Sequence, residues 1–157
     1  MSSTKLFHSF FQKEPSITTS AHGRVNLIGE HTDYNNGFVL PSLIPQSLQV
    51  SIKLRDDDKI IGISNEFGEL QSSITSSNDG TWLDFVRGAI YFCQKLSPSI
   101  KGMEVAVSSS IPSGSGLSSS AALEIALLKA ITQLEGISIQ LQEMAKIGQQ
   151  IEHQFVG

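Results

Sequence analysis

The chain has 157 residues, 39% hydrophobic and 17% charged, which is typical of a globular protein with one substantial core. Fifteen acidic against eleven basic residues give a formal net charge of −4 without a basic stripe, which argues against nucleic acid or anionic membranes as partners. No apolar run approaches the length of a membrane span and no secretory signal is present, so we expect a cytoplasmic protein. The single cysteine, Cys93, excludes an intramolecular disulfide and has the apolar neighbours of a buried thiol.

The first half of the chain predicts a short helix followed by strands. Apolar residues recur at helical spacing over residues 3–13, and Pro15 ends that helix. Residues 48–54 alternate strictly between apolar and polar side chains, which indicates a half-buried strand. Residues 59–64 form the next predicted strand, and the turns on either side of it favour an antiparallel meander.

The second half predicts three helices and one strand. Residues 81–96 place apolar side chains on one helix face, with Thr81 as the expected N-cap. A short strand over residues 103–107 is followed by a loop of small residues. Two more helices are predicted over residues 119–134 and 139–155, so the fold class is α+β.

The loop before the second of these helices has the composition of an anion site. Between Ser110 and Ala122 it carries two glycines and a run of serines, which let backbone N–H groups converge beside the positive end of a helix. It is not a Walker loop, because no Gly-Lys-Ser/Thr ends it. A flexible loop with a serine cap is the alternative. The helix that follows favours the anion site, because Glu124 and Lys129 are its only polar residues from Ala121 to Ile131.

A second segment, from Gly23 to Tyr34, crowds strong hydrogen-bonding groups into a few positions. Donors and acceptors come from four side chains, Arg24, Glu30, His31 and Asp33. A polyhydroxylated ligand needs such fixed partners, because each hydroxyl both donates and accepts. A surface turn with scattered charge and a metal site are the alternatives, and no further His/Cys pair at ligand spacing supports the metal.

A third candidate is Glu152, near the end of the last predicted helix. It falls on one stripe of that helix with Leu141, Ala145 and Gly148. A carboxylate on an apolar face is costly to bury unless a cation pairs with it, and a magnesium ion held by Glu152 and a loop serine would supply that cation. Alternatively, Glu152 lies at the edge of the stripe and reaches water.

Together, the Gly-Arg-Val-Asn-Leu-Ile-Gly-Glu-His-Thr-Asp-Tyr run and the Pro-x-Gly-x-Gly-Leu-Ser-Ser-Ser-Ala loop resemble signatures of the galactokinases, members of the GHMP small-molecule kinase superfamily. The run is specific to galactokinases, whereas the loop marks the superfamily. The resemblance implies that residues 1–157 are a GHMP-kinase N-terminal domain (ribosomal protein S5 domain 2-like), with a mixed or antiparallel sheet and packed helices. His22 departs from the proline that is usual before the Gly-Arg pair.

The resemblance further implies ATP-dependent phosphorylation of galactose at its anomeric hydroxyl, giving galactose 1-phosphate. Arg24 would stabilise the transferred phosphoryl group, and Mg²⁺ would bind to Ser120 and Glu152. The implied galactose ligands are Glu30, His31, Thr32 and Asp33. The implied ATP-binding residues are Ser64, Trp82, Phe85, Gly114, Ser115, Gly116, Leu117, Ser118, Ser119 and Ser120. For Trp82 and Phe85, simple core packing is the alternative.

In this family the catalytic aspartate belongs to a Gly-x-Met-Asp-Gln motif that follows the segment resembling residues 152–157, and a C-terminal domain completes the cleft. Neither occurs in this sequence, so we expect a truncated chain that is inactive by itself. The expected partners are galactose and Mg-ATP, and a monomer is expected. Two alternatives stay open, a non-catalytic galactose/ATP-binding regulator and an N-acetylgalactosamine kinase.

Overall fold

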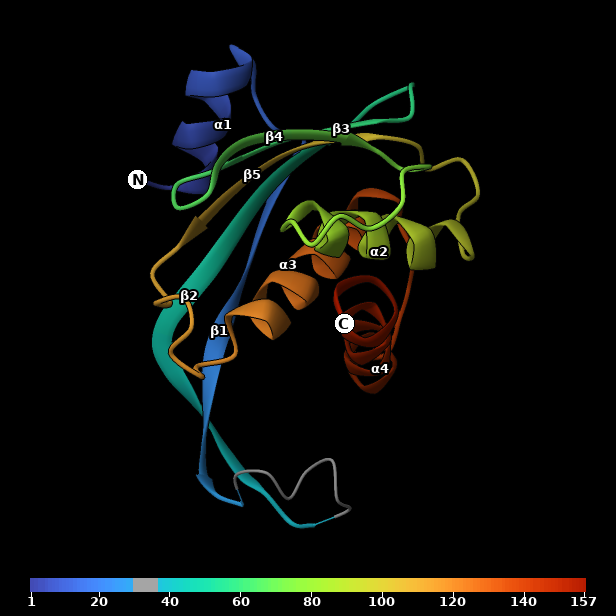
Figure 1. Ribbon diagram of the computed structural model, residues 1–157. Coiled ribbons are helices and arrows are strands. Elements are labelled where there is room, and N and C mark those ends of the chain that lie inside the picture. The colour runs from blue at the N-terminus through green and yellow to red at the C-terminus, as the bar shows by residue number, and fades with distance from the viewer. Residues whose placement is uncertain (30–36) are drawn as a thin grey trace.

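The computed structural model describes residues 1–29 and 37–157, and it shows a five-stranded sheet between two layers of helices (Figure 1). The elements, in chain order, are α1 (Ser3–Phe11), β1 (Ile17–Ile28), β2 (Leu40–Leu54), β3 (Lys59–Ser64), β4 (Gly68–Ser73), α2 (Leu83–Gln94), β5 (Met103–Ser109), α3 (Ser119–Leu134), α4 (Leu141–Ile151) and a π-helical turn, η2 (Glu152–Val156). This confirms the α+β class. No helix within the described ranges is long and apolar enough to cross a bilayer.

The sheet has the strand order β1-β2-β5-β3-β4 and is mixed. Three of its pairs are antiparallel, whereas β3 and β5 run parallel. The expected meander is therefore wrong at one point, because β5 lies between β2 and β3. A parallel neighbour needs a crossover connection, and α2 provides it between β4 and β5. The spacing of apolar residues sets which face of a strand is buried, and it carries no information about this order.

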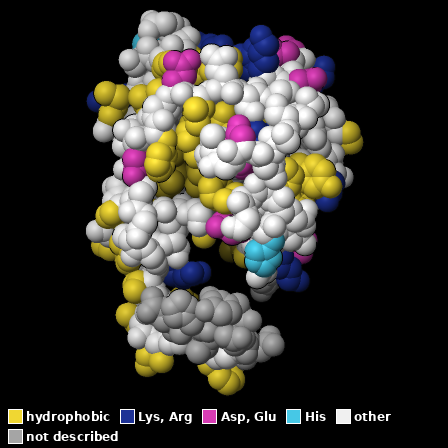
Figure 2. Space-filling model, in the orientation of Figure 1, with side chains coloured by type: hydrophobic (Ala, Val, Ile, Leu, Met, Phe, Trp, Pro, Cys, Tyr) yellow, Lys and Arg dark blue, Asp and Glu magenta, His cyan; other side chains and the backbone are white. Residues whose placement is uncertain are grey.

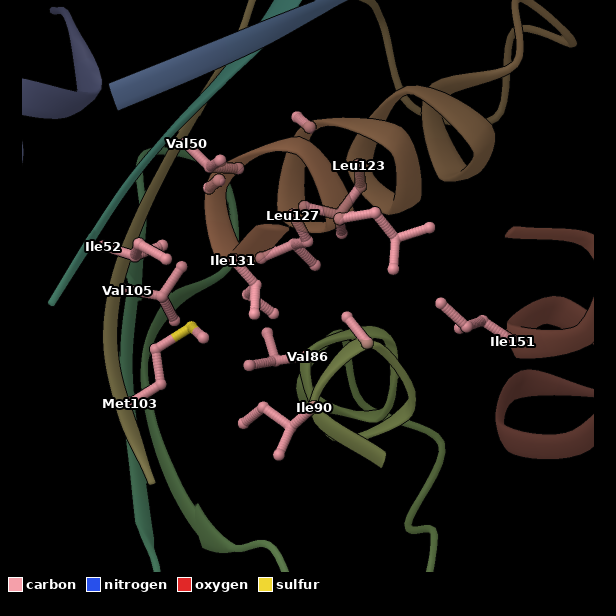
Figure 3. Close-up of a cluster of buried hydrophobic side chains, with 14 of the residues drawn as sticks. Val50, Ile52, Val86, Ile90, Met103, Val105, Leu123, Leu127, Ile131 and Ile151 are labelled. Carbon is pink, nitrogen blue, oxygen red and sulfur yellow. The ribbon is translucent and has the colours of Figure 1, made fainter. Parts of the chain in front are cut away.

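The hydrophobic core lies between the sheet and the layer formed by α2, α3 and α4 (Figure 3). Branched side chains alternate along β2 and β5, so every second residue meets the helices. Fully buried members of this core are Val50, Ile52, Met103, Val105, Val86, Leu127, Ile131 and Ile151. This packing fixes the start of α3 against the end of β5, where the glycine loop lies.

The opposite face of the sheet is covered by α1 (Figure 1). A hydroxyl network joins the two layers, because the Oγ of Ser51 lies 2.8 Å from the Oγ of Ser3 and 2.7 Å from the Oγ1 of Thr18. Ser51 is fully buried, so the prediction that its strand is half-buried is wrong at this position. The polar side of the strand contacts another polar surface instead of water.

The helix predictions are confirmed, with adjusted ends. α1 ends at Phe11, α3 spans the predicted residues, and the last predicted helix divides into α4 and η2. The expected cap is wrong, because Trp82 occupies the N-cap position of α2 and the Thr81 hydroxyl donates to Asp79 at 2.7 Å. No side chain caps α2, and the carboxylate of Asp84 instead accepts a hydrogen bond at 2.8 Å from the backbone N–H of Gly80, in the loop before the helix.

Candidate functional site

A cavity of about 430 Å³ opens beside the N-terminus of α3. Its lining includes residues of the β3–β4 turn, of the segment that leads into α2, of the end of β5 and of the start of α3. Five of the ten predicted nucleotide-binding residues are among its lining residues: Ser64, Trp82, Phe85, Ser119 and Ser120. Figure 2 shows apolar side chains gathered in a hollow of the molecule. The other five, residues 114–118, form the loop that leads into α3.

The indole of Trp82 forms one wall of this cavity and is 9% exposed. It packs on Gly62 of β3, where a Cβ atom would lie 2.8 Å from Cζ2 of Trp82. Its Nε1 is buried without a hydrogen-bond partner among the described residues. Ser64 acts differently. Its Oγ accepts hydrogen bonds from the N–H groups of Glu66 and Phe67, at 3.2 and 3.3 Å, and so fixes the β3–β4 turn.

A buried ion pair supports the same wall from behind. Arg87 donates to Asp84 and, at 2.6 Å, to the Oγ of Ser72, while Asp84 also holds the N–H of Gly80. Both charged side chains are at least 97% buried. The loop that leads to Trp82 is therefore anchored to β4 and α2 by charge-assisted hydrogen bonds.

The glycine loop has a backbone that few residues adopt. Gly114, Gly116 and Ser118 have φ angles of 68°, 72° and 61°, all in the left-handed region. For the non-glycine Ser118 this conformation costs about 1–2 kcal/mol. No side chain caps the N-terminus of α3, so its first N–H groups stay available to a ligand. Free N–H groups at the positive end of a helix dipole are suited to binding an anion.

Arg24 comes close to this loop although it lies 94 positions from Ser118 in the sequence. It lies in β1 where the register with β2 shifts, between His22 and Arg24. Its backbone N–H donates to the carbonyl oxygen of Leu117 at 3.0 Å, and its carbonyl accepts from the Oγ of Ser118 at 3.5 Å. The side chain itself is exposed. The predicted sugar ligands, Glu30, His31, Thr32 and Asp33, lie outside the described residues.

Glu152 begins η2, and its partly buried carboxyl group contacts the carboxyl group of Glu124. Burial, followed by this contact with Glu152, raises the pKa of Glu124 to about 9. Ser120 and Glu124 are four residues apart in α3 and share one helix face. Glu152 thus meets the face of α3 that carries Ser120. Sequence reasoning missed Glu124 as a site residue, although its spacing from Ser120 was an available signal.

The oxygen atoms gathered here fit a magnesium ion. Among the described residues neither Glu124 nor Glu152 forms an ion pair, and the Oε1 of Glu124 is buried without a partner. No group of three or more His, Cys, Asp or Glu side chains gathers anywhere in residues 1–29 and 37–157. Mg²⁺ suits such a sparse set, because it binds one or two carboxylates and takes its other ligands from water and phosphate oxygens.

Comparison with known proteins gives consistent matches. A family model for the galactokinase galactose-binding signature matches residues 5–54, and one for the GHMP kinases N terminal domain matches residues 84–157. The galactokinase of Pasteurella multocida (strain Pm70) is 40% identical over 162 aligned positions, covering 99% of this chain and 42% of that protein.

Solved structures agree with these matches. The crystal structure of Lactococcus lactis galactokinase complexed with galactose has 32% sequence identity and a TM-score of 0.83, covering 98% of this chain and 42% of that one. The mevalonate kinase of Methanococcus jannaschii, at 24% identity and a TM-score of 0.73, covers 87% of this chain and 45% of its own, and shares the fold. The chain therefore spans about two fifths of the length of the galactokinases that it matches, 42% in each case.

Proposed function

Because the chain belongs to the galactokinases, within the GHMP kinases, we propose that the protein transfers the γ-phosphoryl group of ATP to the anomeric hydroxyl of galactose. Residues 1–157 are proposed to be its GHMP-kinase N-terminal domain. One observation carries the proposal. The hydrogen bond from Arg24 to Leu117 holds β1, where the Gly23–Tyr34 segment begins, against the glycine loop. The residues that follow this loop line a cavity large enough for a nucleotide.

The nucleotide is proposed to lie with its base in the apolar part of the cavity. Trp82 and Phe85 provide aromatic surface there. The phosphates then reach residues 114–120, where the left-handed backbone and the uncapped start of α3 present N–H groups. Serine hydroxyls at positions 119 and 120 line the boundary between the two regions.

Arg24 is proposed to stabilise the charge that develops on the transferred phosphoryl group. Its exposed side chain leaves a strand that is hydrogen-bonded to the loop, so the guanidinium can reach an anion bound there. Galactose is proposed to bind to Glu30, His31, Thr32 and Asp33, whose carboxylates and imidazole match the hydroxyls of a sugar. Such transfers depend mainly on positioning and charge neutralisation.

Mg²⁺ is the proposed cation, held by the Ser120 hydroxyl and the Glu152 carboxylate. When bound, it neutralises charge on the β- and γ-phosphate oxygens. Glu152 forms no ion pair with a described residue, which supports this assignment, because its carboxylate is free to pair with a cation.

Nucleotide binding is tested with the intrinsic fluorescence of Trp82, the single tryptophan of the chain. Titration with ATP and Mg²⁺ is expected to change this fluorescence saturably, and Ser120→Ala is expected to weaken the Mg²⁺-dependent part. Ser138→Ala, in the connection between α3 and α4 and away from the cavity, is the matched control. A fluorescence that does not respond to ATP contradicts the proposed site.

The transfer is tested on protein that also carries the Gly-x-Met-Asp-Gln motif of the family. Formation of galactose 1-phosphate is followed by ³¹P NMR with galactose, glucose or N-acetylgalactosamine as acceptor. We expect product with galactose, and we expect Arg24→Ala to lower kcat by about 10²–10³-fold while ATP affinity changes little. Product with N-acetylgalactosamine alone would assign a different sugar. Ligand binding without any product would indicate a regulator.

A further inference from the structure

Glu124 has no part in the transfer proposed above, yet its surroundings are unusual for a carboxyl group. Its side chain is 97% buried in a helix that is otherwise almost entirely apolar. Its Oε1 has no hydrogen-bond partner among the described residues. Leaving a buried polar atom unsatisfied costs about 1–3 kcal/mol, so Glu124 lowers the stability of the fold at a position where an apolar side chain would fit.

The facing helix is shaped to receive this carboxyl group. Gly148 in α4 faces Glu124, and a Cβ atom at position 148 would lie 3.2 Å from the Oε2 of Glu124. One helical turn further along the chain, the carboxyl group of Glu152 contacts Glu124 directly. A glycine and a glutamate four residues apart thus form the two sides of the space that Glu124 occupies.

We propose that Glu124 is a positioning residue: its contact with Glu152 holds that carboxylate toward the Ser120 end of α3, and thereby sets the affinity for a divalent cation bound with nucleotide. Ser120 and Glu124 lie one turn apart, about 6 Å along the helix axis. Glu152 is partly exposed, in a π-helical turn at the end of α4. Without the contact it would lose orientation, and such outer contacts to metal-binding side chains change metal affinity by about 10–100-fold. The inference rests on the proposed function.

Two substitutions at this position separate positioning from packing. Glu124→Gln keeps the shape and a hydrogen-bonding group next to Glu152, whereas Glu124→Met keeps the length and removes the polar group. Thr132→Val is the matched control, because Thr132 is equally buried in α3 and its hydroxyl bonds to the carbonyl of Leu128 in the same helix. The readout is ADP affinity, from Trp82 fluorescence, as a function of Mg²⁺ concentration, with Mn²⁺ electron paramagnetic resonance as a direct measure of the cation.

We expect Glu124→Met to raise the Mg²⁺ concentration needed for half of its effect on ADP affinity about tenfold. Glu124→Gln should stay within about threefold of the unsubstituted protein, since an outer contact of this kind changes affinity only when it is lost. ADP affinity without Mg²⁺ should not change in either variant. If Glu124→Met does not fold, Gly148→Ala is used instead. Its new methyl group presses on Glu124 in a helix that otherwise favours alanine, and it should weaken the Mg²⁺ dependence too.

An unchanged Mg²⁺ dependence in Glu124→Met, or in Gly148→Ala where that variant is used, overturns the inference. A Glu124→Gln variant as weak as Glu124→Met also overturns it, because a charged carboxylate would then be needed as a ligand. If the unsubstituted protein binds ADP without any effect of Mg²⁺, the failure lies with the proposed function. That outcome is recognised before any variant is compared.

Discussion

The backbone N–H of Arg24 and the carbonyl oxygen of Leu117 are joined by a hydrogen bond of 3.0 Å. This bond depends on the preceding residue, Gly23, which is buried against the same carbonyl. A Cβ atom at position 23 would lie 2.8 Å from the Leu117 oxygen and 2.8 Å from Cδ1 of Ile44. The lack of a side chain at Gly23 therefore lets the strand approach the loop.

Gly23→Ala is expected to separate β1 from the glycine loop. Overpacking of this kind costs about 1–3 kcal/mol of stability, and the loop should lose its alignment with Arg24. We expect weaker ATP binding together with a lower urea midpoint. Fluorescence titration and urea unfolding measure the two effects on the same samples. ATP affinity that stays unchanged while stability falls would show that the loop holds its position without the strand.

Gly62→Ala should act on the wall of the cavity that Trp82 forms. The new methyl group would meet Cζ2 of Trp82 at 2.8 Å and Cδ2 of Leu83 at 2.9 Å, so the indole must move into the cavity. We expect a shifted Trp82 emission maximum and about tenfold weaker ADP binding, equivalent to about 1.4 kcal/mol. Ile61→Val, at the neighbouring position on the other face of β3, is the control and should leave both unchanged. An unshifted emission maximum would contradict the predicted movement of Trp82.

The pair of Asp84 and Arg87 allows a double-mutant test of the support behind that wall. Arg87→Met leaves Asp84 charged and buried, and removing one partner of a buried pair costs about 3–5 kcal/mol. Combining Arg87→Met with Asp84→Asn should cost less than the sum of the two single changes. Urea unfolding of the four proteins measures the coupling. Strictly additive losses would mean that the two groups act separately.

Glu124 predicts a pH dependence of stability. Burial, with a further contribution from Glu152, raises its pKa from 4.5 to about 9. Below pH 4.5 both the folded and unfolded states hold the proton. As the pH rises from 4.5 to about 9, the unfolded state releases the proton while the folded state keeps it, so the free energy of unfolding falls over this range. Glu124→Gln should therefore gain stability relative to the unsubstituted protein between about pH 5 and about pH 8. Urea midpoints at both pH values measure this, and a difference that stays constant with pH would contradict the shift.

Cys93 offers a probe of opening of the fold. It is 2% exposed, and burial, followed by the charge of Glu135, raises the pKa of its thiol to about 12. Reaction with a thiol reagent should be slow in the folded protein and fast in urea, because the thiolate is the reactive form. Absorbance of the released thiol product measures the rate. Rapid labelling of the folded protein would place the thiol at the surface.

Local patterns predicted the elements well. The alternation in residues 48–54 and the apolar run from Ala121 to Ile131 are consequences of burial, so they can be read one element at a time. The order of the strands was not predictable in this way, because inserting β5 between β2 and β3 changes no local pattern. Ser51 illustrates the same limit. Its polarity indicated an exposed face, and only the position of α1 shows that a layer of hydroxyl groups covers it.

The candidate site divides along similar lines. The two motifs predicted Arg24 and the loop before α3 as site residues, and the structure places these two segments side by side. Thr81 was assigned as a cap from its residue type, whereas its hydroxyl donates to Asp79 and no side chain caps α2. The contact of Glu124 with Glu152 depends on how α4 packs on α3, which no spacing along either helix specifies.

The place of β5 in the sheet sets the order in which this chain can fold during its synthesis. The β1–β2 and β3–β4 hairpins leave the ribosome first, and each then has an open edge until β5 emerges and pairs with β2 and β3. Translation at roughly 5–20 residues per second makes that interval several seconds for β2, which roughly 50 residues separate from β5, and a shorter time for the β3–β4 hairpin. The nascent chain thus exposes two unpaired strand edges for that time. Slower translation of α2 would prolong the exposure of these edges, and a chaperone that shields strand edges would protect the nascent chain.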